Sequence, residues 1–255
     1  MVGSKMVARI ALGSLLVAGW IGTARAAATP QQKCDTARIT AWKLYQSCVE
    51  TKLASTAKGE SFDYYAAFAR CRHTYFQKWA AFQLPRAGLA TSTCIGARFT
   101  DNGDQTVTDN LSGLVWEKKD SLVGIHNGSN SYSWSAGAPY EENGTAFMIF
   151  LETVNGAGGF GGSNGWRLPT FAELQTIVLD FACPGVGRGP RCICPATPCV
   201  DPALDVVTTQ PDYYWSSTGY VSLPNEAWSV FFSDGDVFPN DMTSNYYVRA
   251  VRGGL

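Results

Sequence analysis

Eight cysteines give this 255-residue chain its most definite chemistry. Four lie in its first part and four in one short later segment: Cys34, Cys48, Cys71, Cys94, Cys183, Cys192, Cys194 and Cys199. In an oxidising compartment an even number of cysteines favours disulfide bonds. The close spacing of Cys192, Cys194 and Cys199 leaves a zinc site as the alternative, although zinc sites usually use two-residue spacers and no histidine lies nearby.

Four oxygen-bearing side chains near the C-terminus could bind a cation. Asn225 and Glu226 stand at the start of a predicted strand, and Asp234 and Asp236 lie in the turn that follows it. Oxygen ligands from neighbouring loops suit Ca²⁺. We therefore take these four residues as candidates for a ligand site and for a calcium site, and we expect no other cofactor.

A second acidic group allows two interpretations. Asp101, Asp104 and Asp109 surround a predicted hairpin turn at Asn102-Gly103. They could bind calcium, but aspartates are also common in tight turns for backbone reasons, and the twelve-residue calcium loop with its final glutamate is absent. The sequence leaves both interpretations open.

Three aromatic residues are further candidates for ligand binding. Tyr132, Trp134 and Tyr140 belong to a segment, 122–140, whose Gly, Ser and Asn content predicts an irregular surface loop. Tyrosine and tryptophan rings contribute much of the contact energy in sugar and protein interfaces. The alternative for Trp134 is a core position. Core positions are predicted for four other tryptophans: Trp116, Trp166, Trp215 and Trp228.

Catalytic chemistry has little support in the sequence. His126 stands alone in the polar loop, and His73 lies beside Cys71 on a predicted helix. No Ser, His and Asp set can be assembled with any spacing that identifies a nucleophile and its base. We therefore expect a protein without catalytic residues.

The elements that must position these residues begin with two helices between residues 31 and 83. Each has apolar residues at helical spacing, and a turn over 55–61 that contains Gly59 predicts an antiparallel hairpin. If the turn is centred near Gly59, Cys48 faces Cys71, and Cys34 comes within reach of Cys94 after a short loop. The geometry therefore predicts the disulfides Cys48–Cys71 and Cys34–Cys94.

A strand-to-helix junction at residues 165–174 organises the second part of the chain. Thr170 can cap a helix with Glu173 three residues later, and Phe171 and Leu174 begin its buried face, which continues through 177–178. Another short apolar helix is predicted over 145–154. Short antiparallel strands are predicted near 99–107, 114–117, 213–218, 227–232 and 247–252.

The N-terminus carries the pattern of a secretory signal. Lys5 and Arg9 precede an apolar run that ends near Ala24, and 24–26 fits a small-x-small cleavage site. We expect residues 1–26 to be removed, no membrane span to remain, and an exported protein in the periplasm, outside the cell or at its surface.

Charge divides the mature chain. Residues 27–96 carry nine Lys and Arg against four Asp and Glu, a balance of +5, whereas 97–255 carry eight against seventeen, a balance of −9. The basic hairpin could dock on acidic surfaces, or its charges could simply be solvated. No nucleic-acid motif accompanies these charges.

Several motifs occur in one order that resembles the Lcl C-terminal domain family. They lie at residues 98–104, 109–116, 165–170, 214–218, 227–228 and 247–252, including Gly165-Trp166-Arg167-Leu168-Pro169-Thr170. The resemblance covers about residues 98–253. It implies a C-type-lectin-like fold, and in the collagen-like bacterial adhesin that names the family this domain binds sulfated polysaccharides and forms trimers. The Trp-Arg-Leu-Pro-Thr motif also resembles formylglycine-generating enzymes, which share that scaffold.

Together these observations predict an α+β protein with three parts. The signal peptide, 1–26, is followed by a disulfide-linked two-helix hairpin, 27–96, and a lectin-like domain, 97–255, with two helices packed on short antiparallel strands. The expected function is binding or adhesion, with a carbohydrate or an envelope protein as partner. A formylglycine-generating-like enzyme and a purely structural envelope protein are the alternatives, and assembly of identical chains is left open.

Overall fold

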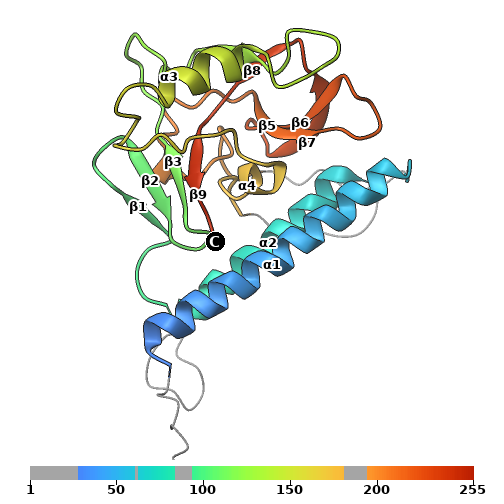
Figure 1. The fold of residues 1–255 in the computed structure, drawn as a ribbon. Coiled ribbons are helices and arrows are strands. Elements are labelled where there is room, and N and C mark those ends of the chain that lie inside the picture. The colour runs from blue at the N-terminus through green and yellow to red at the C-terminus, as the bar shows by residue number, and fades with distance from the viewer. Residues whose placement is uncertain (1–27, 61–62, 84–93, 181–193) are drawn as a thin grey trace, which may run out of the picture.

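The computed structural model describes residues 28–60, 63–83, 94–180 and 194–255. The predicted signal peptide, Cys183 and Cys192 lie outside these described residues. The described part is a mixed α+β structure, in which a helical hairpin precedes two small β-sheets (Figure 1). No helix in this part is both long and apolar enough to cross a membrane.

The helices are α1 (Pro30–Ala57), α2 (Tyr64–Gln83), α3 (Glu152–Val154) and α4 (Phe171–Gln175), with a π-helical turn η1 (Ala146–Leu151) and a 3-10 turn η2 (Pro202–Leu204). The strands are β1 (Phe99–Asp101), β2 (Thr106–Asp109), β3 (Leu114–Glu117), β4 (Ser131–Ser133), β5 (Tyr213–Gly219), β6 (Glu226–Phe231), β7 (Asp236–Asp241), β8 (Asn245–Tyr247) and β9 (Val251–Gly253). The predicted apolar helix over 145–154 is therefore present as η1 followed by α3.

The hairpin of α1 and α2 forms as its sequence predicts. Thr29 and Gln32 make a reciprocal capping box at the start of α1. Gly59 takes a φ of +72° in the turn, a left-handed conformation that glycine adopts without steric cost. The structure contains both predicted disulfides, Cys34–Cys94 and Cys48–Cys71. The bridges join the two helices to each other and α1 to the segment that leads into β1.

The strands form a four-stranded sheet in the order β1-β2-β3-β9 and a five-stranded sheet in the order β4-β8-β5-β6-β7. Most pairs are antiparallel as predicted, but β5 and β8 pair in parallel through Tyr214 and Tyr247. The predicted strand over 247–252 is also interrupted, because the chain passes there from one sheet to the other. Arg249, in the interruption, is fully buried and donates to the Glu117 carbonyl and to the Thr209 hydroxyl.

Helix α4 starts at the predicted junction. The Thr170 hydroxyl accepts from the Glu173 amide, and the Glu173 carboxylate accepts from the Thr170 amide, so the predicted capping box is present. The same carboxylate binds both terminal nitrogens of Arg167 at 2.6 and 2.7 Å. Phe171 and Leu174 are fully buried, which confirms the predicted inner face of the helix.

The hairpin packs directly on the second part of the chain, on the side of α4 (Figure 1). Phe68 of α2 contacts the rings of Phe171 and Trp228 edge-on, at centroid distances of 4.8 and 5.8 Å. The Tyr45 hydroxyl of α1 donates to the Ala172 carbonyl at 2.8 Å. Helical and strand-rich parts therefore share one hydrophobic core.

Candidate functional site

The aromatic candidates are mostly buried. Tyr132 and Trp134 are only 6% and 5% exposed, so Tyr132 does not form an exposed binding surface, and Trp134 takes the core position that was its alternative. The reason is that β4 pairs with β8, and the Trp134 indole N–H donates to the Ser216 carbonyl at 3.0 Å. Tyr140 is partly exposed at the edge of the same apolar cluster. The four tryptophans predicted as core are all buried.

The four calcium candidates do not converge. In the β6–β7 ladder, Glu226 pairs with Asp241 and Phe231 pairs with Asp236. Five residues of strand separate the two pairs, which places Glu226 about 17 Å from Asp236. Asn225 lies at the first end, and Asp234 lies in the turn at the other. These residues therefore cannot form one calcium site, and within the described residues no three His, Cys, Asp or Glu side chains are grouped to hold a metal.

The other acidic group serves the turns around β1 and β2. Asp104 accepts from the amide and hydroxyl of Thr106, and buried Asp109 binds Arg98 through both carboxylate oxygens at 3.0 and 3.1 Å. Asp101 accepts from the Lys118 ammonium at 2.7 Å. The structure therefore supports a role for these aspartates in the turns, rather than calcium binding.

The later cysteine segment contains a disulfide. Cys194 and Cys199 are bonded to each other, so these two sulfurs are not zinc ligands. The bridge closes a short loop that precedes η2. It leaves no free thiol among the described cysteines.

A small cleft next to the β2–β3 pair brings charged side chains together. We call it the polar cleft; its volume is about 290 Å³, and it is lined by Asp101, Gly103, Gln105, Lys118, Lys119, Asp120 and Asp205. These residues come from the β1–β2 turn, from the segment after β3 and from the segment after η2. Three chain segments that are distant in sequence therefore meet there.

Lys118 ties two of these segments together. Its ammonium lies 2.7 Å from Asp101 and 3.2 Å from Asp205, and only 19% of the side chain is exposed. The hydrogen bond from Lys118 lowers the pKa of Asp101, and the bond to Asp101 raises the pKa of Lys118. The Lys118–Asp101 pair is thus stabilised in its charged form, and Lys118 bridges the two aspartates across the cleft.

Beneath the cleft lies a buried charge cluster centred on Glu117. One oxygen of this carboxylate contacts Lys119 Nζ at 2.9 Å and His126 Nδ1 at 2.7 Å, and the other accepts from the Ala250 amide. Burial by itself would raise the pKa of Glu117, but the Lys119 ammonium and the His126 and Ala250 hydrogen bonds hold it below its ordinary value. The cluster anchors the end of β3, from which the cleft residues Lys118 and Lys119 follow.

The two loops at the cleft are packed tightly on each other. The Thr208 hydroxyl donates to the Lys119 carbonyl at 2.9 Å, and a side chain at Gly128 would overlap the Thr208 carbonyl oxygen. Gln105 and Asp205, which line the cleft, have φ angles of +65° and +55°. Non-glycine residues rarely adopt this conformation, and such strain is concentrated at functional sites.

Sequence reasoning did not find the polar cleft as a site. Its signal was the run Glu117-Lys118-Lys119-Asp120, four consecutive charged residues that begin at the end of a predicted strand, in a chain of which only 16% is charged. That run identifies the charged residues at the end of the predicted strand. It does not show that Asp205, 85 positions further on, meets them.

Comparison with known proteins identifies one family. Residues 105–252 match the model of the Lcl C-terminal domain, a range that runs from β2 into β9 and includes all of the polar cleft except Asp101 and Gly103. No curated protein and no solved structure matches the chain. The matched region is more than half of the sequence and agrees with the resemblance of its motifs. The chain therefore belongs to the Lcl C-terminal domain family.

Proposed function

We propose that this protein is an exported, non-enzymatic binding module whose C-type-lectin-like domain recognises a neutral carbohydrate at the polar cleft. The signal pattern at residues 1–26 and the disulfides support export into an oxidising compartment. Membership of the family, and two small sheets with short helices against them, support the lectin-like assignment.

The single observation that carries the proposal is the bridge from Lys118 to Asp101 and Asp205. It holds hydrogen-bonding groups from three segments in fixed positions within a cleft, and ligand sites in proteins typically combine a concave surface with a few such groups. The carboxylates can accept from sugar hydroxyls, and the Gln105 amide can both donate and accept. Fixed groups lose little entropy on binding.

Two exposed apolar side chains lie two positions in sequence from two residues of the cleft. Leu122 and Val207 are 65% and 95% exposed, and they belong to the loops that carry Asp120 and Asp205. Exposed aliphatic side chains beside polar groups can pack against the C–H faces of a sugar ring while its hydroxyls bind within the cleft.

The negative charge of the domain favours a neutral glycan over a sulfated one. The cleft is lined by three aspartates and Lys118, the ammonium of Lys119 is buried against Glu117, and residues 97–255 carry a balance of −9. Binding a sulfated polysaccharide requires a cationic surface. We therefore expect this chain to differ from the adhesin that names the family in the glycans it selects.

A glycan array with the mature protein tests this function. We expect binding to neutral glycans and no change when calcium is replaced by a chelator, because the acidic candidates of β6 and β7 are too far apart to share an ion. Binding restricted to sulfated glycans, or binding that requires calcium, would contradict the proposal.

A further inference from the structure

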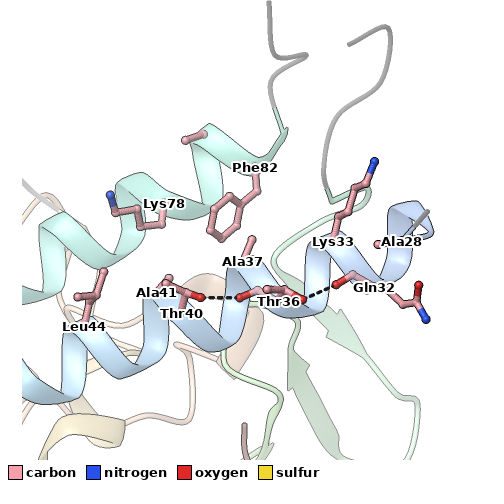
Figure 2. A pocket seen from close by; sticks show the side chains of 11 residues that line it. Ala28, Gln32, Lys33, Thr36, Ala37, Thr40, Ala41, Leu44, Lys78 and Phe82 are labelled. Atoms are coloured by element: carbon pink, nitrogen blue, oxygen red, sulfur yellow. Dashed lines mark hydrogen bonds between the residues drawn. The ribbon is translucent and has the colours of Figure 1, made fainter. Parts of the chain in front are cut away.

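The outer face of the helical hairpin carries a second hollow, which the carbohydrate proposal does not use. This hollow, the outer groove, has a volume of about 610 Å³ and lies between α1 and α2 (Figure 2). Its lining includes Thr36, Ala37, Thr40, Ala41, Leu44 and Phe82. The groove exists because α1 has small residues there, while α2 contributes a large ring at Phe82.

A ligand can displace water from the α1 side of the outer groove without leaving the threonine hydroxyls there unsatisfied. The hydroxyls of Thr36 and Thr40 each donate at 2.8 Å to the carbonyl four residues earlier in α1, and Figure 2 shows these bonds running along the helix. Burying a polar group is costly mainly when it has no hydrogen-bond partner. The methyl groups of these threonines and of Ala37 therefore form an effectively apolar floor.

The shape of the groove matches an elongated ligand. Its lining on α1 runs from Gln32 to Leu44, which at 1.5 Å per residue is about 18 Å, or more than three helical turns. Leu44 at one end is 61% exposed, and Gln32, Thr36 and Thr40 along the α1 side are exposed too, so the groove is open to solvent there. A thin acyl chain would stay largely in water there, whereas a helix could insert a row of side chains and cover the rim.

The rim of the groove is positively charged. Its lining contains Lys33 and Lys78 and no acidic residue. Both lysines are exposed, and neither side-chain ammonium has a hydrogen-bond or salt-bridge partner within the described part of the chain. Because Cys48 faces Cys71 in the hairpin, Lys78 lies opposite Ala41, about 12 Å along the axis from Lys33.

We propose that the outer groove binds an amphipathic helix of a partner protein, with apolar side chains in the groove and acidic residues against Lys33 and Lys78. The 12 Å separation corresponds to acidic residues seven or eight positions apart on that helix. The groove and the polar cleft have no lining residue in common, and Phe68, which packs on the core, does not line the groove, so a partner helix can bind while the polar cleft is occupied.

Fluorescence polarisation with a designed probe tests this interface. The probe is an 18-residue helical peptide with leucines on one face and glutamates eight positions apart, and its control has lysines in place of the glutamates. We expect the acidic peptide to bind, and the pair Lys33→Glu and Lys78→Glu to weaken it by about tenfold or more. The lysine peptide should then prefer the charge-reversed protein. Ala41→Trp, which places a large ring in the groove, should abolish binding of the acidic peptide.

The matched control is the pair Lys43→Glu and Lys58→Glu, which changes the same charge on exposed positions outside the groove. Circular dichroism melting of every variant shows whether the hairpin remains folded. Equal binding of both peptides, or equal loss in the control pair, would overturn the proposal. Binding of dodecanoate without binding of the acidic peptide would overturn it, and so would groove-dependent self-association without peptide binding.

Discussion

At the level of single residues, the most consequential side chain is Glu117. It is fully buried, and its carboxylate contacts Lys119, His126 and the Ala250 amide. A buried charge of this kind is tolerated because its partners satisfy it. Glu117 also lies at the end of β3, where the residues of the polar cleft leave the sheet. Its contacts therefore hold the cleft in place.

Replacing Glu117 with Gln should destabilise the protein strongly. The substitution leaves the buried Lys119 ammonium without its ionic partner, which costs about 3 to 5 kcal/mol when one member of a buried pair is removed. Chemical denaturation measures the loss, with Glu50→Gln on the exposed surface of α1 as the control. A loss for Glu117→Gln no larger than that of the control would show that the cluster is not stabilising.

The same residue predicts a pH dependence. The partners of Glu117 hold its pKa below its ordinary value of 4.5, so the folded state binds this proton less readily than the unfolded chain does. The resulting stabilisation is fully present above about pH 4.5 and is lost as pH falls further through the folded pKa. Thermal melts between pH 7 and pH 3 should show a steeper acid loss in the parent than in Glu117→Gln. Parallel curves would contradict this assignment.

Residue patterns predicted four buried tryptophans correctly but could not decide between a buried and an exposed position for Trp134. Trp134 lies in a segment rich in Gly, Ser and Asn, and that composition indicates a surface loop. Its burial depends on Ser216, 82 positions away, whose carbonyl accepts from the indole. Local sequence does not contain this information, because the pairing of β4 with β8 creates the environment. Tyr132 was misassigned for the same reason.

At the level of elements, the hairpin was the most predictable part of the fold. The spacing of Cys34, Cys48 and Cys71 along two amphipathic helices, with one glycine turn, fixes both the register and the disulfides. The capping box of Thr170 and Glu173 was equally visible, because its contacts are three residues apart. The strand predicted over 247–252 was not predictable in detail, since its interruption at Arg249 depends on a partner in β3.

The disulfides should rank by the length of chain they close. Cys34–Cys94 and Cys48–Cys71 join residues 60 and 23 positions apart, and Cys194–Cys199 joins residues 5 apart. The chain-entropy relation gives about 4, 3 and 2 kcal/mol respectively. Paired Cys→Ala variants measured by denaturation should follow this order. A reversed order would show that native-state packing, rather than the unfolded chain, governs the effect.

At the level of the whole molecule, the helical hairpin and the family domain share one hydrophobic core. The basic hairpin was predicted as a separate domain, and its sequence lies outside the family match. The structure nevertheless places Phe68 of α2 against Phe171 and Trp228. The aromatic spacing of α2 indicated a buried face but not what covers it. Residues of the five-stranded sheet and of α4 cover this face of α2.

Phe68→Ala should therefore weaken both halves together. Phe68 is fully buried, and truncating a phenylalanine in a core costs about 3 to 5 kcal/mol. Far-ultraviolet dichroism reports mainly on the helices, and tryptophan fluorescence reports on both halves. We expect the two transitions to coincide in the parent and to shift together in the variant. Separate transitions, with the domain unaffected, would mean that the hairpin is only loosely attached.

The most direct test of the account is a calorimetric titration of the neutral glycan that binds best on the array. Lys118→Met removes the bridge between Asp101 and Asp205, and we expect it to weaken binding by about tenfold or more. Asn225→Ala lies outside the polar cleft, at the end of β6, and should change affinity by no more than about twofold. Unchanged affinity in Lys118→Met, or an equal loss in Asn225→Ala, would contradict carbohydrate binding at the polar cleft.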